Sequence, residues 1–152
     1  MIGLSKSGVL DHNDRLENYA KEKASWLKSH PTESEVKMKE FLNNHGIKYE
    51  FKKPFLYTPF YGEYVKHYVI ADFFIPEANI ILDINLISFF KEDKYTDAKY
   101  AKLRKAKKNI TVYHWNNNDF KLYNSMKALV TRINDKIKQN EKKKNDDKIN
   151  RS

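Results

Sequence analysis

The chain reads HYVIADFFIPEANIILDINLIS from His67 to Ser88. Two apolar runs flank the short segment 76–79, which begins with a proline. This pattern predicts two strands joined by a tight turn. Each run contains one carboxylate, Asp72 in the first and Asp83 in the second. A charge inside a buried strand is costly unless a partner offsets it, so these two acids are the first candidates for chemistry.

The sequence around this stretch predicts helices on both sides of the strands. Residues 32–35 read TESE, which is a capping box that starts a helix ending at Gly46. Ile47, Tyr49 and Phe51 alternate with charged residues, including Lys52, and indicate a half-buried strand closed by Pro54. The full predicted order is helices from residue 14 and at 32–45, strands at 47–53, 64–74 and 80–86, a helix at 91–108, a strand at 110–115 and a helix from 120.

This order predicts an α/β fold, a mixed sheet of about four strands flanked by helices. We expect residues 1–13 to form a flexible arm, residues 14–138 a single domain, and residues 139–152 a disordered charged tail.

The charge and the amino-acid composition limit the kinds of function to expect. The 152 residues carry a net charge of +9 and contain no cysteine. The positive charge favours nucleic acid or another polyanion as a partner, although a lysine-rich composition explains it equally well. Without cysteine, disulfides and thiolate zinc sites are excluded. No signal segment or membrane span is visible, so we expect a cytoplasmic protein with no membrane partner.

Three acids are expected on inward positions. Asp72 and Asp83 lie on strands joined by a short turn, and such strands pair directly, so the two acids can come close. Glu35 lies on the apolar face of its helix. Such oxygen ligands favour Mg²⁺ or Mn²⁺, which can activate water against a phosphodiester. Capping of the helix is an equally complete explanation for Glu35.

The chain resembles very-short-patch-repair endonuclease domains in a series of short segments that occur in the same order. These are TESE (32–35), FKKP (51–54), ADFFIP (71–76) and DIN (83–85), followed by Asp97 and ITVYHWN (110–116). These domains belong to the PD-(D/E)XK restriction-endonuclease-like superfamily. The resemblance covers roughly residues 20–130. It implies metal-dependent cleavage of DNA, with Glu35, Asp72 and Asp83 as metal and catalytic residues.

In these endonuclease domains, the second residue of the acidic strand motif is usually Lys or Asp, and the resemblance places Asn85 at that position. Asn85 or a lysine from the next helix would then orient the water, and the lysine candidates are Lys91, Lys94 and Lys99. Together with Lys52, Lys53 and Lys102, these lysines are the candidate nucleic-acid contacts. Because Asn85 supplies no charge, the alternative is a catalytically inactive nuclease-fold protein that binds nucleic acid or a protein complex. A protein partner or a homodimer also fits, with the tyrosine-rich segment 57–64 either stacking bases or forming an interface.

Overall fold

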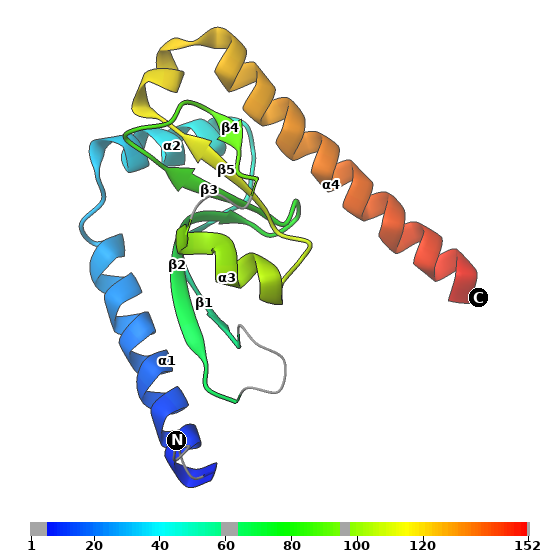
Figure 1. Cartoon of the computed structure of the whole chain (residues 1–152). Helices are drawn as coiled ribbons and strands as arrows, with labels where there is room; N and C mark the ends of the chain where they lie inside the picture. The colour runs from blue at the N-terminus through cyan, green and yellow to red at the C-terminus, as the bar shows by residue number, and fades with distance from the viewer. Residues whose placement is uncertain (1–5, 59–63, 95–97, 152) are drawn as a thin grey trace.

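The computed structural model describes residues 6–58, 64–94 and 98–151 and forms a mixed sheet flanked by helices (Figure 1). The α/β class predicted from the sequence is therefore confirmed. The helices are α1 (Lys6–Lys28), α2 (Glu33–Asn44), α3 (Ala98–Ala106), the 3₁₀ helix η1 (Asn117–Lys121) and α4 (Tyr123–Arg151). The strands are β1 (Glu50–Tyr57), β2 (His67–Ile75), β3 (Ile80–Ile84), β4 (Lys91–Glu92) and β5 (Thr111–Trp115).

The sheet has five strands in the order β1-β2-β3-β5-β4. β1, β2 and β3 form an antiparallel meander, as the short predicted turn requires. α3 lies in the connection from β3 to β5, which pair in parallel, and β4 adds an antiparallel edge on β5. The fifth strand escaped prediction because β4 has only two residues.

Two apolar clusters cover the sheet. The first contains Met38 and Leu42 of α2 with Leu129 and Ile133 of α4, and the second contains Tyr100 and Leu103 of α3. β2 and β3 contribute side chains to both clusters, which explains why these strands are apolar throughout.

The β1–β2 hairpin changes face where Lys52 lies opposite Asp72. Phe73 belongs to the first cluster and Ala71 to the second, although residues two apart in a regular strand share one face. The partners on either side keep one register, Phe51 with Phe73 and Lys53 with Ala71. Lys52 has a positive φ of 52°, and this left-handed backbone coincides with the change of face. Lys52 is buried as a result, whereas the simple alternation predicted it on the polar side.

The predicted end of the first strand at Pro54 is wrong, because β1 continues to Tyr57 and pairs Pro54 with Ile70. β1 is an edge strand, and a proline there removes no N–H that a neighbouring strand needs. The predicted helix at 91–108 is shorter in the structure, which has β4 at residues 91–92 and α3 from Ala98. Asp97 lies outside the described residues.

The two ends of the described chain are helical. α1 begins at Lys6 rather than at residue 14, and α4 continues to Arg151 through the segment expected to be a disordered tail. Both extensions lie on the outside of the molecule (Figure 1). The extension of α4 is rich in lysine, which has good helix propensity even without a core to pack on. Within the described residues, no helix combines the length and apolar character needed to cross a bilayer.

Candidate active site

Asp72 and Asp83 lie opposite each other on neighbouring strands. Phe73 pairs with Leu82 in the antiparallel β2–β3 ladder, so the same register brings Asp72 and Asp83 together. Both residues are buried, with 8% and 7% of their surface exposed. The convergence of these two acids was predicted from the short turn between the strands, and the structure brings them together.

Lys52 joins Asp72 to Glu35. Its ammonium group lies 2.7 Å from Asp72 Oδ1 and contacts Glu35 Oε2. Glu35 also closes the capping box of α2, because its Oε1 accepts the N–H of Thr32 at 2.9 Å. Glu35 therefore has both a capping role and an ion-pair role. The second oxygen of Asp72 accepts the backbone N–H of Ile84 at 2.9 Å.

Asp83 has a separate set of partners from α3 and β5. Tyr100 donates its hydroxyl to Asp83 Oδ1 at 3.1 Å, and His114 Nδ1 lies 3.1 Å from Oδ2. Lys99 Nζ lies 3.8 Å from Oδ1. The sequence suggested Lys91, Lys94 or Lys99 as the source of the positive charge that Asn85 does not supply. The structure places Lys99 next to Asp83.

A buried pair behind His114 completes the cluster. His114 Nε2 lies 3.4 Å from Asp93 Oδ1, and Arg104 contacts the other Asp93 oxygen at 3.0 Å. Sequence reasoning missed Asp93, Arg104 and His114. The parallel pairing of β3 with β5 sets Asp83 beside His114, and that pairing carries no signal in the local sequence.

The pKa values of Asp83 and Lys52 are both raised, but for different reasons. Burial raises the pKa of Asp83, and the negative charge of Asp72 raises it further, against smaller opposing effects of Lys99 and His114. For Lys52, burial alone would lower the pKa, but the hydrogen bonds and charges of Asp72 and Glu35 outweigh burial and raise it. Lys52 is thus held in its charged form, whereas burial and the charge of Asp72 favour the neutral form of Asp83.

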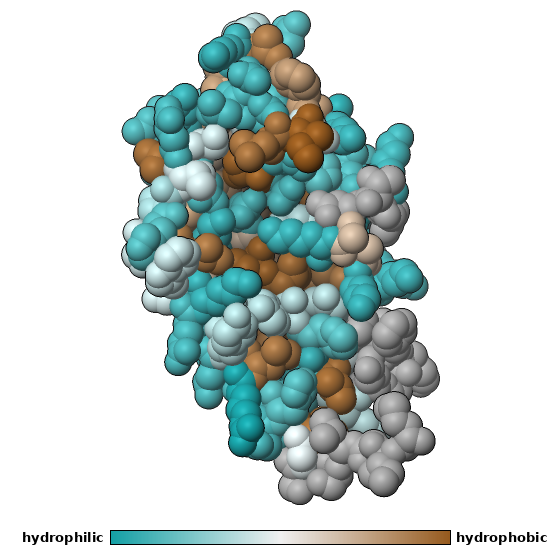
Figure 2. All heavy atoms as spheres, turned by 60° about the vertical axis from the view of Figure 1, so that its left-hand side comes forward, coloured by the Kyte–Doolittle hydropathy of each residue, from teal (hydrophilic) through white to brown (hydrophobic). Residues whose placement is uncertain are grey.

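A hollow of about 520 Å³ opens beside Asp72. Its lining includes Lys23 of α1, Lys52 of β1, Tyr68 of β2 and Lys99 of α3. Figure 2 views the side of the molecule on which α1 comes forward, and apolar side chains there lie between hydrophilic ones. Asp72 and Glu35 neutralise Lys52, so Lys23 and Lys99 are the lysines of this lining that could attract an anionic ligand.

Comparison with known proteins finds no match. No family model, curated protein or solved structure is similar to the chain at a significant level. The chemistry of the site therefore has to be argued from its own residues.

The other predicted site residues lie apart from the carboxylates. Asn85 follows the end of β3, and its Oδ1 accepts the N–H groups of Ile87 at 2.6 Å and Ser88 at 3.2 Å. Lys53 lies 3.6 Å from Glu50 and lines a different hollow. The remaining predicted contacts are exposed on β4, in the loop after it and on α3, namely Lys91, Lys94 and Lys102.

The donor chemistry at Asp72 and Asp83 fits a divalent cation. Across the described ranges, no group of three or more His, Asp or Glu side chains is arranged as a ready metal cage. Mg²⁺ does not need one, because it is commonly held by one or two carboxylates together with water and substrate phosphate oxygens. Burial and then the negative charge of Asp72 raise the pKa of Asp83, and a bound cation would relieve the repulsion between the two acids. Asp72, Asp83 and Glu35 already have protein partners on both oxygens. A cation would therefore have to share or replace some of these contacts, and at Glu35 that would break the capping box of α2.

Proposed function

We propose that this protein binds DNA and hydrolyses its phosphodiester bonds in a metal-dependent reaction at Asp72 and Asp83. The observation that carries the proposal is the opposition of these two buried carboxylates, with Lys52 on one side and Lys99 on the other. Paired acids flanked by cations suit a phosphodiester, whose negative charge needs neutralising as a nucleophile approaches.

Each side chain has a distinct part in the proposed reaction. Asp72 and Asp83 would hold Mg²⁺ or Mn²⁺, which supplies Lewis-acid polarisation of the phosphodiester and lowers the pKa of bound water. Lys52 is held in its charged form by Glu35 and Asp72, and it faces the hollow in which a phosphate would lie. Lys99 lines the same hollow and adds a second positive charge near the developing charge on phosphorus oxygens.

The test is cleavage of supercoiled plasmid and of circular single-stranded DNA with Mg²⁺ or Mn²⁺, each compared with EDTA. We expect the wild-type protein to cleave at least one of the two substrates, with a loss of at least about 100-fold in Asp72→Asn and Asp83→Asn, because removing a ligand removes several kcal/mol of transition-state stabilisation. Asp135→Asn is the matched control, because this carboxylate is exposed on α4. Cleavage that survives in both site variants would come from a contaminant and would refute the proposal.

A second candidate is a nuclease-fold protein that binds nucleic acid without cutting it. Asn85 favours this candidate, because its amide oxygen is engaged in the turn with Ile87 and Ser88 and it provides no charge to a reaction. The same samples decide between the two candidates. DNA binding that weakens with salt as phosphate contacts should, with no cleavage under either metal, would favour the second.

A further inference from the structure

The hollow beside Asp72 has an aromatic wall as well as charged groups. Tyr68 lines it and packs edge-on against Tyr19, with ring centroids 5.8 Å apart. The ammonium group of Lys23 lies 5.8 Å from the centre of the Tyr68 ring. Lysines near a ring form the combination that holds single-stranded nucleic acid, in which a base stacks on the ring and a cation contacts the phosphate.

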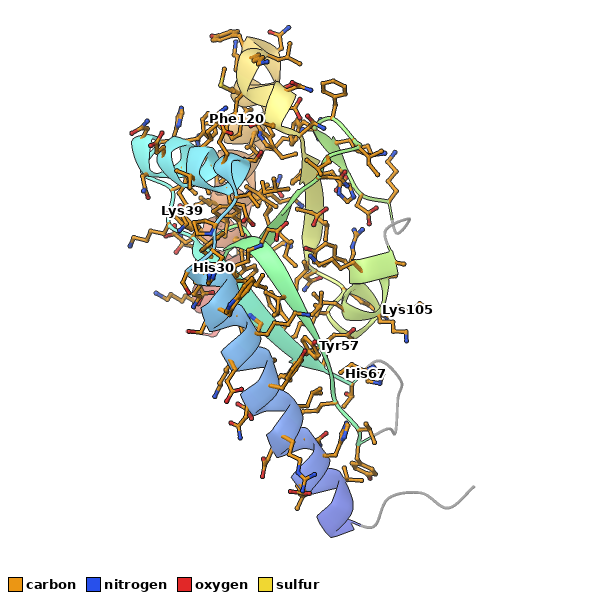
Figure 3. All side chains as sticks on the ribbon, turned by 90° about the vertical axis from the view of Figure 1, so that its left-hand side faces the viewer. His30, Lys39, Tyr57, His67, Lys105 and Phe120 are labelled. Carbon is orange, nitrogen blue, oxygen red and sulfur yellow. The ribbon has the colours of Figure 1, made fainter. Side chains whose placement is uncertain are left out.

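The candidate catalytic groups lie too deep for a base-paired strand. The side chains of Lys52, Asp72 and Asp83 are only 10%, 11% and 10% exposed. α1 and α3 both contribute to the lining of the hollow, and Figure 3 shows β2 passing between these two helices. A duplex is stiff, and its backbone cannot follow such a recess without a large deformation. Enzymes that act at buried sites solve this problem by taking an unpaired or extruded nucleotide.

We infer that the hollow receives an unpaired nucleotide, so that single-stranded nucleic acid is the substrate class of this protein. The base stacks on Tyr68, and Lys23 and Lys99 contact the phosphates on either side. The inference rests on the nucleic-acid part of the proposed function, but it does not require that the protein cleaves its ligand.

The test is equilibrium binding by fluorescence anisotropy in EDTA, so that cleavage plays no part. One labelled oligodeoxynucleotide of mixed sequence is used alone and annealed to its complement. We expect the single strand to bind at least about ten-fold more tightly. Tyr68→Ala should weaken single-strand binding by at least about five-fold, the lower end for loss of one stacked base, and Tyr68→Phe should restore it. Lys23→Gln should weaken it and reduce its salt dependence.

Matched controls separate the hollow from general surface charge. Tyr123→Ala changes a tyrosine that is 70% exposed on α4, and Lys105→Gln changes an exposed lysine that points outward from α3 (Figure 3). Both should bind like the wild type. Circular dichroism shows whether Tyr68→Ala is folded. Lys23→Gln tests the same hollow at an exposed position of α1, where the substitution should not disturb the fold.

Two results would overturn the inference. If the duplex binds as tightly as the single strand and both hollow variants match the wild type, the hollow is not the binding site, while the broader nucleic-acid proposal stands. If neither form binds at low salt, where electrostatic affinity is greatest, both the inference and the nucleic-acid proposal fail. Binding of the single strand without cleavage under Mg²⁺ or Mn²⁺ would support the inference and refute only the catalytic part of the proposed function.

Discussion

Asp72 and Asp83 face each other across β2 and β3, yet each has its own basic partner. Lys52 lies 2.7 Å from Asp72, and His114 lies 3.1 Å from Asp83. The two partners come from opposite parts of the sheet, β1 and β5. Lys52 therefore balances the charge of Asp72 from β1, and His114 contacts Asp83 from β5. Asp72 also lines the hollow.

Lys52 should be essential for stability. Replacing it by Met removes the cation between Glu35 and Asp72 and should lower the free energy of unfolding by about 3–5 kcal/mol, because two carboxylates remain buried without compensation. Urea denaturation at neutral pH measures the change. Lys53→Met is the control. It should lower the free energy of unfolding by less than about 1 kcal/mol, because Lys53 is 36% exposed and its ion pair with Glu50, at 3.6 Å, lies on the surface.

The triple variant Lys52→Met, Glu35→Gln, Asp72→Asn checks the cause. It should recover part of the lost stability, because neutral amides in place of the acids leave no isolated charge. A loss for Lys52→Met as small as that for Lys53→Met would mean that the buried ion pair does not stabilise the fold.

Asn79 should tolerate glycine and reject a branched residue. It ends the turn between β2 and β3 with a positive φ of 53°. Asn79→Val should lower the free energy of unfolding by about 1–2 kcal/mol, because a β-branched side chain is strained in this conformation, and Asn79→Gly should keep stability within about 1 kcal/mol. Glu77→Val, an exposed position in the same turn, is the control in thermal denaturation. Equal losses for Val at both positions would contradict this explanation.

The sequence could predict the centre of the site but not its surroundings. Asp72 and Asp83 could be paired because a short turn makes β2 and β3 neighbours. Lys52 was expected on the polar side, since nothing in the sequence announces the left-handed backbone that turns it inward. His114 reaches Asp83 through the pairing of β5 with β3, and Asp93, directly after β4, reaches His114 through the pairing of β4 with β5. Those pairings depend on how the whole chain packs, and β4 is too short to leave a periodic pattern.

Tyr57 should make the fold sensitive to alkaline pH. Burial raises its pKa above the ordinary value of 10.0. As the pH rises through the ordinary value, the unfolded chain loses the phenolic proton while the folded chain keeps it, so stability falls. Tyr57→Phe cannot ionise, and its loss of stability above about pH 10 should be smaller than that of the wild type. Urea denaturation across this range measures the difference, and Tyr123→Phe, which is exposed on α4, should behave like the wild type. Parallel curves for the wild type and Tyr57→Phe would contradict the prediction.

Asn85 should act through its turn rather than through its amide nitrogen. Its Oδ1 accepts the N–H groups of Ile87 and Ser88 and so fixes the loop that leaves β3 directly after the site. Asn85→Ala removes both hydrogen bonds and should lower the free energy of unfolding by about 1 kcal/mol, with faster hydrogen exchange at the amides of Ile87 and Ser88. Asn85→Asp keeps an oxygen acceptor in the same place and should preserve both the exchange protection and the stability. Asn145→Ala, on the exposed surface of α4, should leave these two amides unchanged. If Asn85→Asp loses their protection as fully as Asn85→Ala does, the amide nitrogen of Asn85 has a role of its own, and the departure from a charged residue at this position needs another explanation.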